Sequence, residues 1–159
     1  MLKKLCSIPI FFWIACSAIN AQVIITTTPA FPTANDEVTI VYDASEGTGG
    51  LSNCSCDVYL HTGVITSVST GPSDWKYVVT TWGQANAAWK MTPVPGQPNK
   101  YSYVIGPSIR DYYGVPANEV IEKMAFVFRN AAGTLEGKDV GGTDIFYDVF
   151  AENIPLTTS

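Results

Sequence analysis

Hydrophobic and polar residues alternate with a period of two in several short runs of the chain. In one run Val38, Ile40 and Tyr42 share one face of an extended segment, which is typical of a strand with one buried face. Similar reasoning predicts about seven strands, at residues 37–43, 58–62, 77–82, 88–94, 100–105, 124–129 and 145–150. Turn-forming residues separate these runs, so we predict an all-β fold, an antiparallel immunoglobulin-like β-sandwich.

One short helical turn is expected after the strand at 100–105. Pro107 suits a first helical turn, residues 108–113 can continue it, and Gly114 can end it in a left-handed conformation. Pro116 then prevents the helix from resuming.

The N-terminal residues have the order of a secretory signal peptide. Two lysines precede an almost wholly apolar run at 5–19, and Ala21 is a small residue at the expected cleavage position. We therefore predict a signal peptide at 1–21 and a secreted protein, extracellular or periplasmic, without a membrane segment in its mature form. A lipoprotein acylated at Cys16 is the alternative, and a tryptophan where such signals usually carry leucine counts against it.

The length of 159 residues favours a single folded domain. Residues 22–35 are predicted to be an extended lead-in, in which Pro29 and Pro32 exclude a helix and a central strand. We assign the sandwich to 36–150, and 151–159 to the start of a linker or a truncated tail.

Charge and cysteine content narrow the classes of partner. A net charge of −5 argues against nucleic acid, whose phosphates need clustered Lys and Arg. After cleavage the chain keeps Cys54 and Cys56, which either pair or remain thiols. We interpret them as a local loop staple, because two Cys and the single His61 do not complete a zinc site.

Enzymatic and metal-binding interpretations have weak support. Any Ser-His-Asp arrangement must use His61, no GxSxG element accompanies it, and a strand histidine is more often a surface residue. In an acidic Gly-rich loop, Asp139 and Asp144 are weak calcium candidates, and Lys138 would oppose the ion. We therefore expect no catalysis, metal or cofactor.

The aromatic residues are the main candidates for a binding site. Sugar rings present flat C–H surfaces that stack on indole or phenol, while their hydroxyls seek amides, carboxylates and hydroxyls nearby. Such aromatics must either fill a core or await a ligand. The carbohydrate-binding candidates are Trp75, Trp82 and Trp89, followed by Tyr77 and Tyr112.

The same segments carry a resemblance to a known family. They are, in order, DVYLHTGVIT, SDWKYV, TTWG, a third Trp with KMT, NKYSYVIGPSIRDYYGVP, MAFVFRNAAG and GKDVGGTDIFYDV. From about Asp36 to about Val149 the chain resembles the N-terminal immunoglobulin-like, starch-binding-type module that precedes the catalytic barrel of secreted bacterial α-amylase-family glycosidases.

The resemblance implies a non-catalytic accessory domain that contacts an α-glucan polysaccharide or oligosaccharide. The alternative it implies is a structural domain that packs against a glycosidase catalytic domain without binding sugar. Because the sequence stops at Ser159 before any barrel, we expect no hydrolase activity from it.

Overall fold

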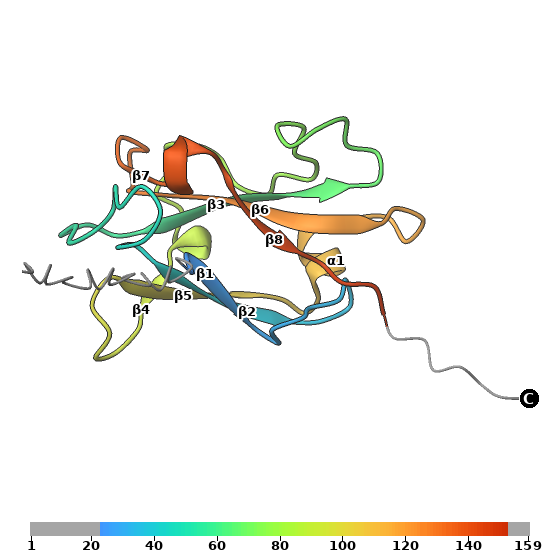
Figure 1. The fold of residues 1–159 in the computed structure, drawn as a ribbon, viewed down its shortest axis with the longest axis horizontal. Helices are drawn as coiled ribbons and strands as arrows, with labels where there is room; N and C mark the ends of the chain where they lie inside the picture. The colour runs from blue at the N-terminus through green and yellow to red at the C-terminus, as the bar shows by residue number, and fades with distance from the viewer. Residues whose placement is uncertain (1–22, 153–159) are drawn as a thin grey trace, which may run out of the picture.

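The computed structural model describes residues 23–152, which fold into two antiparallel β-sheets packed face to face (Figure 1). The first sheet has the strand order β1-β2-β5-β4, and the second has β3-β6-β7, with β8 also paired to β6. The strands are β1 (Ile25–Thr28), β2 (Val38–Asp43), β3 (Tyr59–Thr66), β4 (Thr92–Pro93), β5 (Lys100–Ile105), β6 (Ile121–Arg129), β7 (Glu136–Gly137) and β8 (Ile145–Asp148). The predicted all-β antiparallel sandwich is thus confirmed.

The core lies between the sheets and is built by alternate residues of each strand. In β2 the three residues predicted to share a face are fully buried, as are Met124, Phe126 and Phe128 of β6. The rings of Tyr42 and Phe128 stack across the two sheets with centroids 3.8 Å apart. The remaining residues of β3 and β6 therefore point away from this core, toward the outer face of the second sheet.

The predicted helical turn is confirmed as α1 (Ile109–Tyr113). The Asp111 N–H donates to the Ser108 side chain, which caps the first turn. Gly114 ends the helix in the left-handed region with φ 70°. Cys54 and Cys56 form a disulfide in the loop before β3, so the predicted staple is the alternative that the structure shows.

Two of the predicted strands are wrong. Residues 77–82 have strand-like composition but form an irregular segment, because Tyr77 has φ 51° and turns the chain out of an extended conformation. In 88–94 the 3-10 turn η1 (Ala87–Trp89) replaces the first part of the expected strand, Lys90 forms an isolated bridge with Tyr59, and only β4 is a strand. A second 3-10 turn, η2 (Val140–Gly142), precedes β8.

The N-terminal part of the sandwich begins earlier than predicted. β1 lies inside the segment assigned as lead-in and is an edge strand, which the prolines after it allow. The predicted signal peptide at 1–21 and residues 153–159 of the predicted tail lie outside the described residues. Among residues 23–152, no helix is long and apolar enough to cross a membrane.

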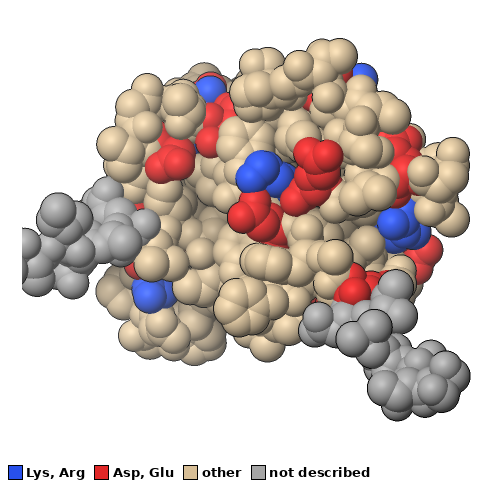
Figure 2. All heavy atoms as spheres, turned by 45° about the vertical axis from the view of Figure 1, so that its right-hand side comes forward, with Lys and Arg blue, Asp and Glu red and all other residues tan. Residues whose placement is uncertain are grey.

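Charged side chains are sparse on the face shown in Figure 2. They lie in small groups, in which basic side chains sit close to acidic ones, and wide uncharged areas separate the groups. The chain has 9 Lys and Arg against 14 Asp and Glu. On this face the described residues form no broad basic area of the kind that polyanion binding needs.

Candidate functional site: an aromatic hollow on the outer sheet face

A shallow hollow of about 230 Å³ lies on the outer face of the second sheet. Its lining residues are His61, Ser73, Trp75, Trp82, Val127 and Asp144. His61 of β3 and Val127 of β6 are directly paired across the ladder, and both belong to the set that points away from the core. The hollow thus has a floor of regular sheet, while its tryptophans come from the irregular segment after β3.

This irregular segment is attached to the free edge of β3. Val64 N–H donates to the Lys76 carbonyl at 3.0 Å, and Lys76 N–H donates back to the Val64 carbonyl at 2.7 Å. A side chain at Gly63 would meet the Lys76 carbonyl and Val78 at 2.9 Å, so only glycine lets the segment come this close. Trp75 is therefore placed beside His61 by backbone contacts as well as by its own packing.

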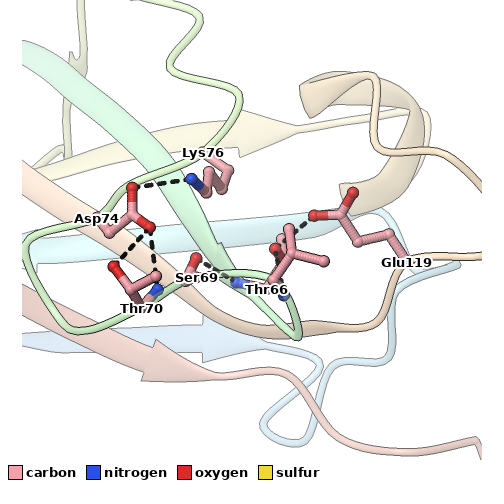
Figure 3. A network of polar contacts seen from close by, with 7 residues as sticks. Thr66, Ser69, Thr70, Asp74, Lys76 and Glu119 are labelled. Atoms are coloured by element: carbon pink, nitrogen blue, oxygen red, sulfur yellow. Dashed lines mark hydrogen bonds and ion pairs between the residues drawn. The ribbon is translucent and has the colours of Figure 1, made fainter.

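A polar network holds the loop before Trp75 (Figure 3). Thr70 donates its N–H and its hydroxyl to Asp74 at 2.9 and 3.1 Å, and Lys76 Nζ donates to the same carboxylate at 2.9 Å. The ammonium of Lys76 and the Thr70 donors lower the pKa of Asp74 to about 2. Glu119 ties the two ends of this loop together. One of its carboxylate oxygens accepts a hydrogen bond from the Thr66 hydroxyl, and the other accepts one from the Tyr77 hydroxyl at 2.6 Å.

His61 is hydrogen-bonded through Nδ1, and its surroundings disfavour the protonated imidazole. Its Nδ1 lies 2.7 Å from the Thr80 hydroxyl, which also accepts the Thr62 N–H at 3.1 Å. The hydroxyl and Nδ1 share one hydrogen bond, and the imidazole tautomer sets which of the two donates. Burial lowers the pKa of His61, as does the positive charge of Arg129, against a smaller opposing effect of Asp144.

The two indoles approach His61 in different ways. The ring of Trp75 lies nearly parallel to the imidazole, with centroids 5.8 Å apart and planes 28° apart, whereas Trp82 meets it edge-on at 5.1 Å and 86°. The two indole planes are therefore steeply inclined to one another and do not form a flat platform. Trp82 is 41% exposed, and Trp75 is half-buried with an Nε1 that has no hydrogen-bond partner.

Arg129 fixes the loop that carries Trp82. It is fully buried at the end of β6, and its guanidinium lies 5.7 Å from the Trp82 ring centroid. It donates to four backbone carbonyls at 2.8–3.0 Å, those of Thr81, Gln84, Asn130 and Ala131. The indole also rests on Gly133, where a Cβ would come within 2.6 Å of its Nε1. Trp82 is exposed but firmly held.

A family model described as a domain of unknown function (DUF8578) matches residues 25–136. The chain belongs to this family. The matched region runs from β1 to the beginning of β7 and includes His61, both tryptophans of the hollow and Arg129, whereas Asp144 lies beyond it. No curated protein matches the chain.

The remaining aromatic candidates lie elsewhere and do not line the hollow. Tyr77 packs against the core and donates to Glu119. Tyr112 of α1 also packs against the core, with its hydroxyl 2.9 Å from that of Tyr103. Trp89 is partly exposed in η1. Of the five aromatic residues singled out in the sequence, the structure brings together only Trp75 and Trp82.

The calcium candidates are engaged within the protein. Asp139 accepts the Val140 N–H and caps η2, while Asp144 lies 3.6 Å from Lys138 Nζ. Lys138 also pairs with Glu136 at 3.4 Å, so its charge offsets both carboxylates. Between residues 23 and 152, no three His, Cys, Asp or Glu side chains gather closely enough to hold a metal ion.

Ser73, His61 and Asp144 share the hollow but do not form a catalytic triad in this arrangement. A triad requires the carboxylate on one imidazole nitrogen and the hydroxyl on the other. Here Thr80 occupies Nδ1, and in the described part of the chain no hydrogen bond joins the three side chains. Their chemistry is that of hydrogen-bonding groups around two indole faces.

The sequence predicts a surface position for His61, names Asp144 only as a weak calcium candidate, and does not single out Ser73, Val127 or Arg129 as site residues. One feature of the sequence points to His61: it lies between Leu60 and Thr62 in a strand. Alternation therefore places its side chain on the face opposite to those two buried residues.

Proposed function

We propose that this protein is a secreted, non-catalytic carbohydrate-binding module that binds α-glucan in the aromatic hollow. The observation that carries the proposal is the gathering of Trp75, Trp82 and His61, with Asp144 and Ser73, in one solvent-open hollow. Indole faces offer stacking surfaces for sugar C–H groups. The imidazole, carboxylate and hydroxyl groups beside them offer partners for sugar hydroxyls.

The inclination of the indoles favours a curved glycan over a flat one. Successive sugars of an α-1,4-glucan turn relative to one another, whereas a β-1,4-glucan is a flat ribbon that lies on coplanar aromatics. The planes of Trp75 and Trp82 make angles of 28° and 86° with the plane of His61, so the two indoles face different directions. Each indole can therefore stack on a different one of two neighbouring sugar rings that are turned relative to one another. The resemblance to starch-binding-type modules points to the same ligand class.

Affinity electrophoresis in gels with and without soluble starch tests the proposal. We expect starch to retard the protein, and Trp82→Ala or Trp75→Ala to abolish the retardation. Trp89→Ala is the matched control, because it removes an indole outside the hollow and should leave retardation intact. Unchanged mobility of the wild-type protein in starch and glycogen, or equal loss in all three variants, contradicts the proposal.

Export is part of this proposal. The disulfide between Cys54 and Cys56 supports an oxidising compartment, and the N-terminal sequence supports a signal peptide at 1–21. Mass spectrometry of the protein recovered from an exporting host should show Gln22 as the first residue. A chain that begins with a lipid-modified Cys16 would instead establish the lipoprotein alternative.

One observation favours a second candidate function, which is docking of a glycosidase catalytic barrel. Phe31 and Phe150 are 72% and 41% exposed and pack edge-to-face with centroids 5.2 Å apart. Sedimentation of the protein mixed with an α-amylase catalytic barrel tests it. A complex that Phe31→Ser disrupts supports docking, and two independently sedimenting species contradict it.

A further inference from the structure

A second hollow lies further along the same outer face of the sheet. Its volume is about 340 Å³, and its lining includes Ile65 and Lys123 on the strands, Pro72 in the loop and Phe146 of β8. Ser69 and Thr70 add hydroxyls, and Glu122 adds a carboxylate. The surface thus combines apolar faces with hydrogen-bonding groups, as the aromatic hollow does.

The strand register places the two hollows in line. Beyond Tyr59–Arg129, three successive outward-pointing pairs of the β3–β6 ladder are His61–Val127, Gly63–Ala125 and Ile65–Lys123. The aromatic hollow lies over the first pair and the second hollow over the third. The first and third pairs are four positions apart along each strand, a span of about 13 Å, which is longer than a single sugar ring.

The two hollows also share their walls. On one side, residues 69–72 border the second hollow and Ser73 and Trp75 border the first, so one loop forms both edges. On the other side, Asp144 and Phe146 belong to the same short stretch at the start of β8. The middle pair of the ladder, Gly63 and Ala125, is buried. Val78 lies over Gly63 and is 43% exposed, so its side chain forms the surface between the two hollows.

We propose that the two hollows are consecutive subsites for one linear α-glucan chain. The sugars stacked on the indoles occupy the first, and the chain continues over the exposed side chain of Val78, which covers Gly63, into the second. There Phe146 and Ile65 receive C–H faces, while Lys123 and the hydroxyls of the loop bind sugar hydroxyls. This inference rests on the proposed function and adds a prediction about ligand length.

Titration calorimetry with maltotriose and maltoheptaose measures that prediction. In the wild-type protein the longer ligand should bind about tenfold more tightly, equivalent to ~1.4 kcal/mol. Phe146→Ala should remove most of this gain and change maltotriose affinity less than about twofold. Lys123→Ala, which alters an exposed side chain of the same hollow, should reduce the gain in part.

Phe31→Ala is the matched control, since it truncates an exposed phenylalanine outside both hollows and should preserve the gain. Amide NMR shifts at Lys123 and Ala125 should respond to maltoheptaose and not to maltotriose. Equal affinity for both ligands, or a gain that survives in Phe146→Ala, overturns the second subsite and leaves the proposed function standing. Failure of every ligand to bind overturns both.

Discussion

At the scale of single residues, Trp82 combines exposure with an unusual degree of fixation. Its indole is 41% exposed, yet Gly133 lies beneath it, His61 meets it edge-on and the buried Arg129 lies against its ring. An exposed aromatic held in one orientation loses little conformational entropy when a ligand stacks on it. This fixation is what distinguishes Trp82 from a tryptophan that simply lacks a partner.

Because so much of Trp82 is exposed, Trp82→Ala should cost little stability. We expect a loss of about 1 kcal/mol in the free energy of unfolding, compared with about 3–5 kcal/mol for truncation of a buried aromatic. Urea unfolding measures the loss. A cost in the range of a core tryptophan would mean that the indole supports the fold, and loss of starch binding in this variant would then carry no information about contact.

The lowered pKa of His61 predicts a specific dependence of stability on pH. In the unfolded chain the imidazole titrates near 6.5, whereas the folded protein takes up this proton only at lower pH. Between the two values the unfolded state binds more protons, so the free energy of unfolding falls as pH drops below about 7. Arg129 opposes protonation of the folded state and Asp144 assists it.

Since His61 is the only histidine, untagged protein allows a clean comparison. The wild-type protein should lose stability between pH 7.5 and pH 5.5 in urea unfolding, and His61→Gln should show a much flatter profile. Identical slopes for the two proteins would contradict a lowered pKa of the half-buried imidazole.

At the scale of elements, β3 and the segment after it act as a unit. β3 supplies the floor of the hollow, and the following loop returns along its free edge to supply the walls. The polar network around Asp74 fixes this return before any ligand arrives. Preorganisation of this kind contributes to affinity by reducing the entropy lost on binding.

Asp74→Asn should therefore weaken starch binding by about three- to tenfold and leave the melting temperature nearly unchanged. The amide keeps the shape of the side chain, but it loses the ion pair with Lys76 and weakens the bonds from Thr70. Asp57→Asn is the matched control, because it removes a similar exposed ion pair, with Lys90, outside both hollows. Equal effects of the two variants would exclude a specific role for the loop network.

Protonation of Asp74 at low pH should have the same effect on the loop as Asp74→Asn. The pKa of Asp74 lies below its ordinary value, so the stabilisation that this carboxylate gives the loop is present above about pH 4 and is lost as pH falls toward 2.

Strand periodicity predicts the regular elements well and the loop walls poorly. The alternation in 37–43, 100–105 and 124–129 reflects one buried face, and the structure confirms these strands. Residues 77–82 have the same apolar, β-branched composition because they pack beside β3. The backbone reversal at Tyr77 that prevents a strand has no signature in composition.

The candidate site is likewise predicted in part. Aromatic chemistry names Trp75 and Trp82, which the structure brings together in the hollow, but it names Trp89 and Tyr112 equally, and these lie elsewhere. Arg129 is not predictable as a clamp, since its partners are backbone carbonyls, which every residue possesses.

At the scale of the whole molecule, the residues that stabilise the core and the residues of the proposed binding site lie on opposite faces of the second sheet. Met124, Phe126 and Phe128 of β6 fill the core, while Val127 and Ala125 support the outer face. Substitutions at adjacent positions can therefore affect different properties, as long as the sheet itself remains folded.

Phe126→Ala tests this separation from the side of the core. Phe126 is fully buried and its ring lies parallel to that of Phe128, with centroids 6.0 Å apart. Removal of the ring leaves a cavity between the sheets, and we expect a loss of about 3–5 kcal/mol in the free energy of unfolding. Urea unfolding measures this loss. Phe31→Ala is the control, because truncation of this exposed side chain should cost less than about 0.5 kcal/mol.

In the fraction of Phe126→Ala that remains folded, starch affinity should be unchanged, because no atom of the hollow is removed. A mild loss of stability would show that residue 126 does not face the core, and the alternation that places His61 and Val127 on the outer face would fail with it.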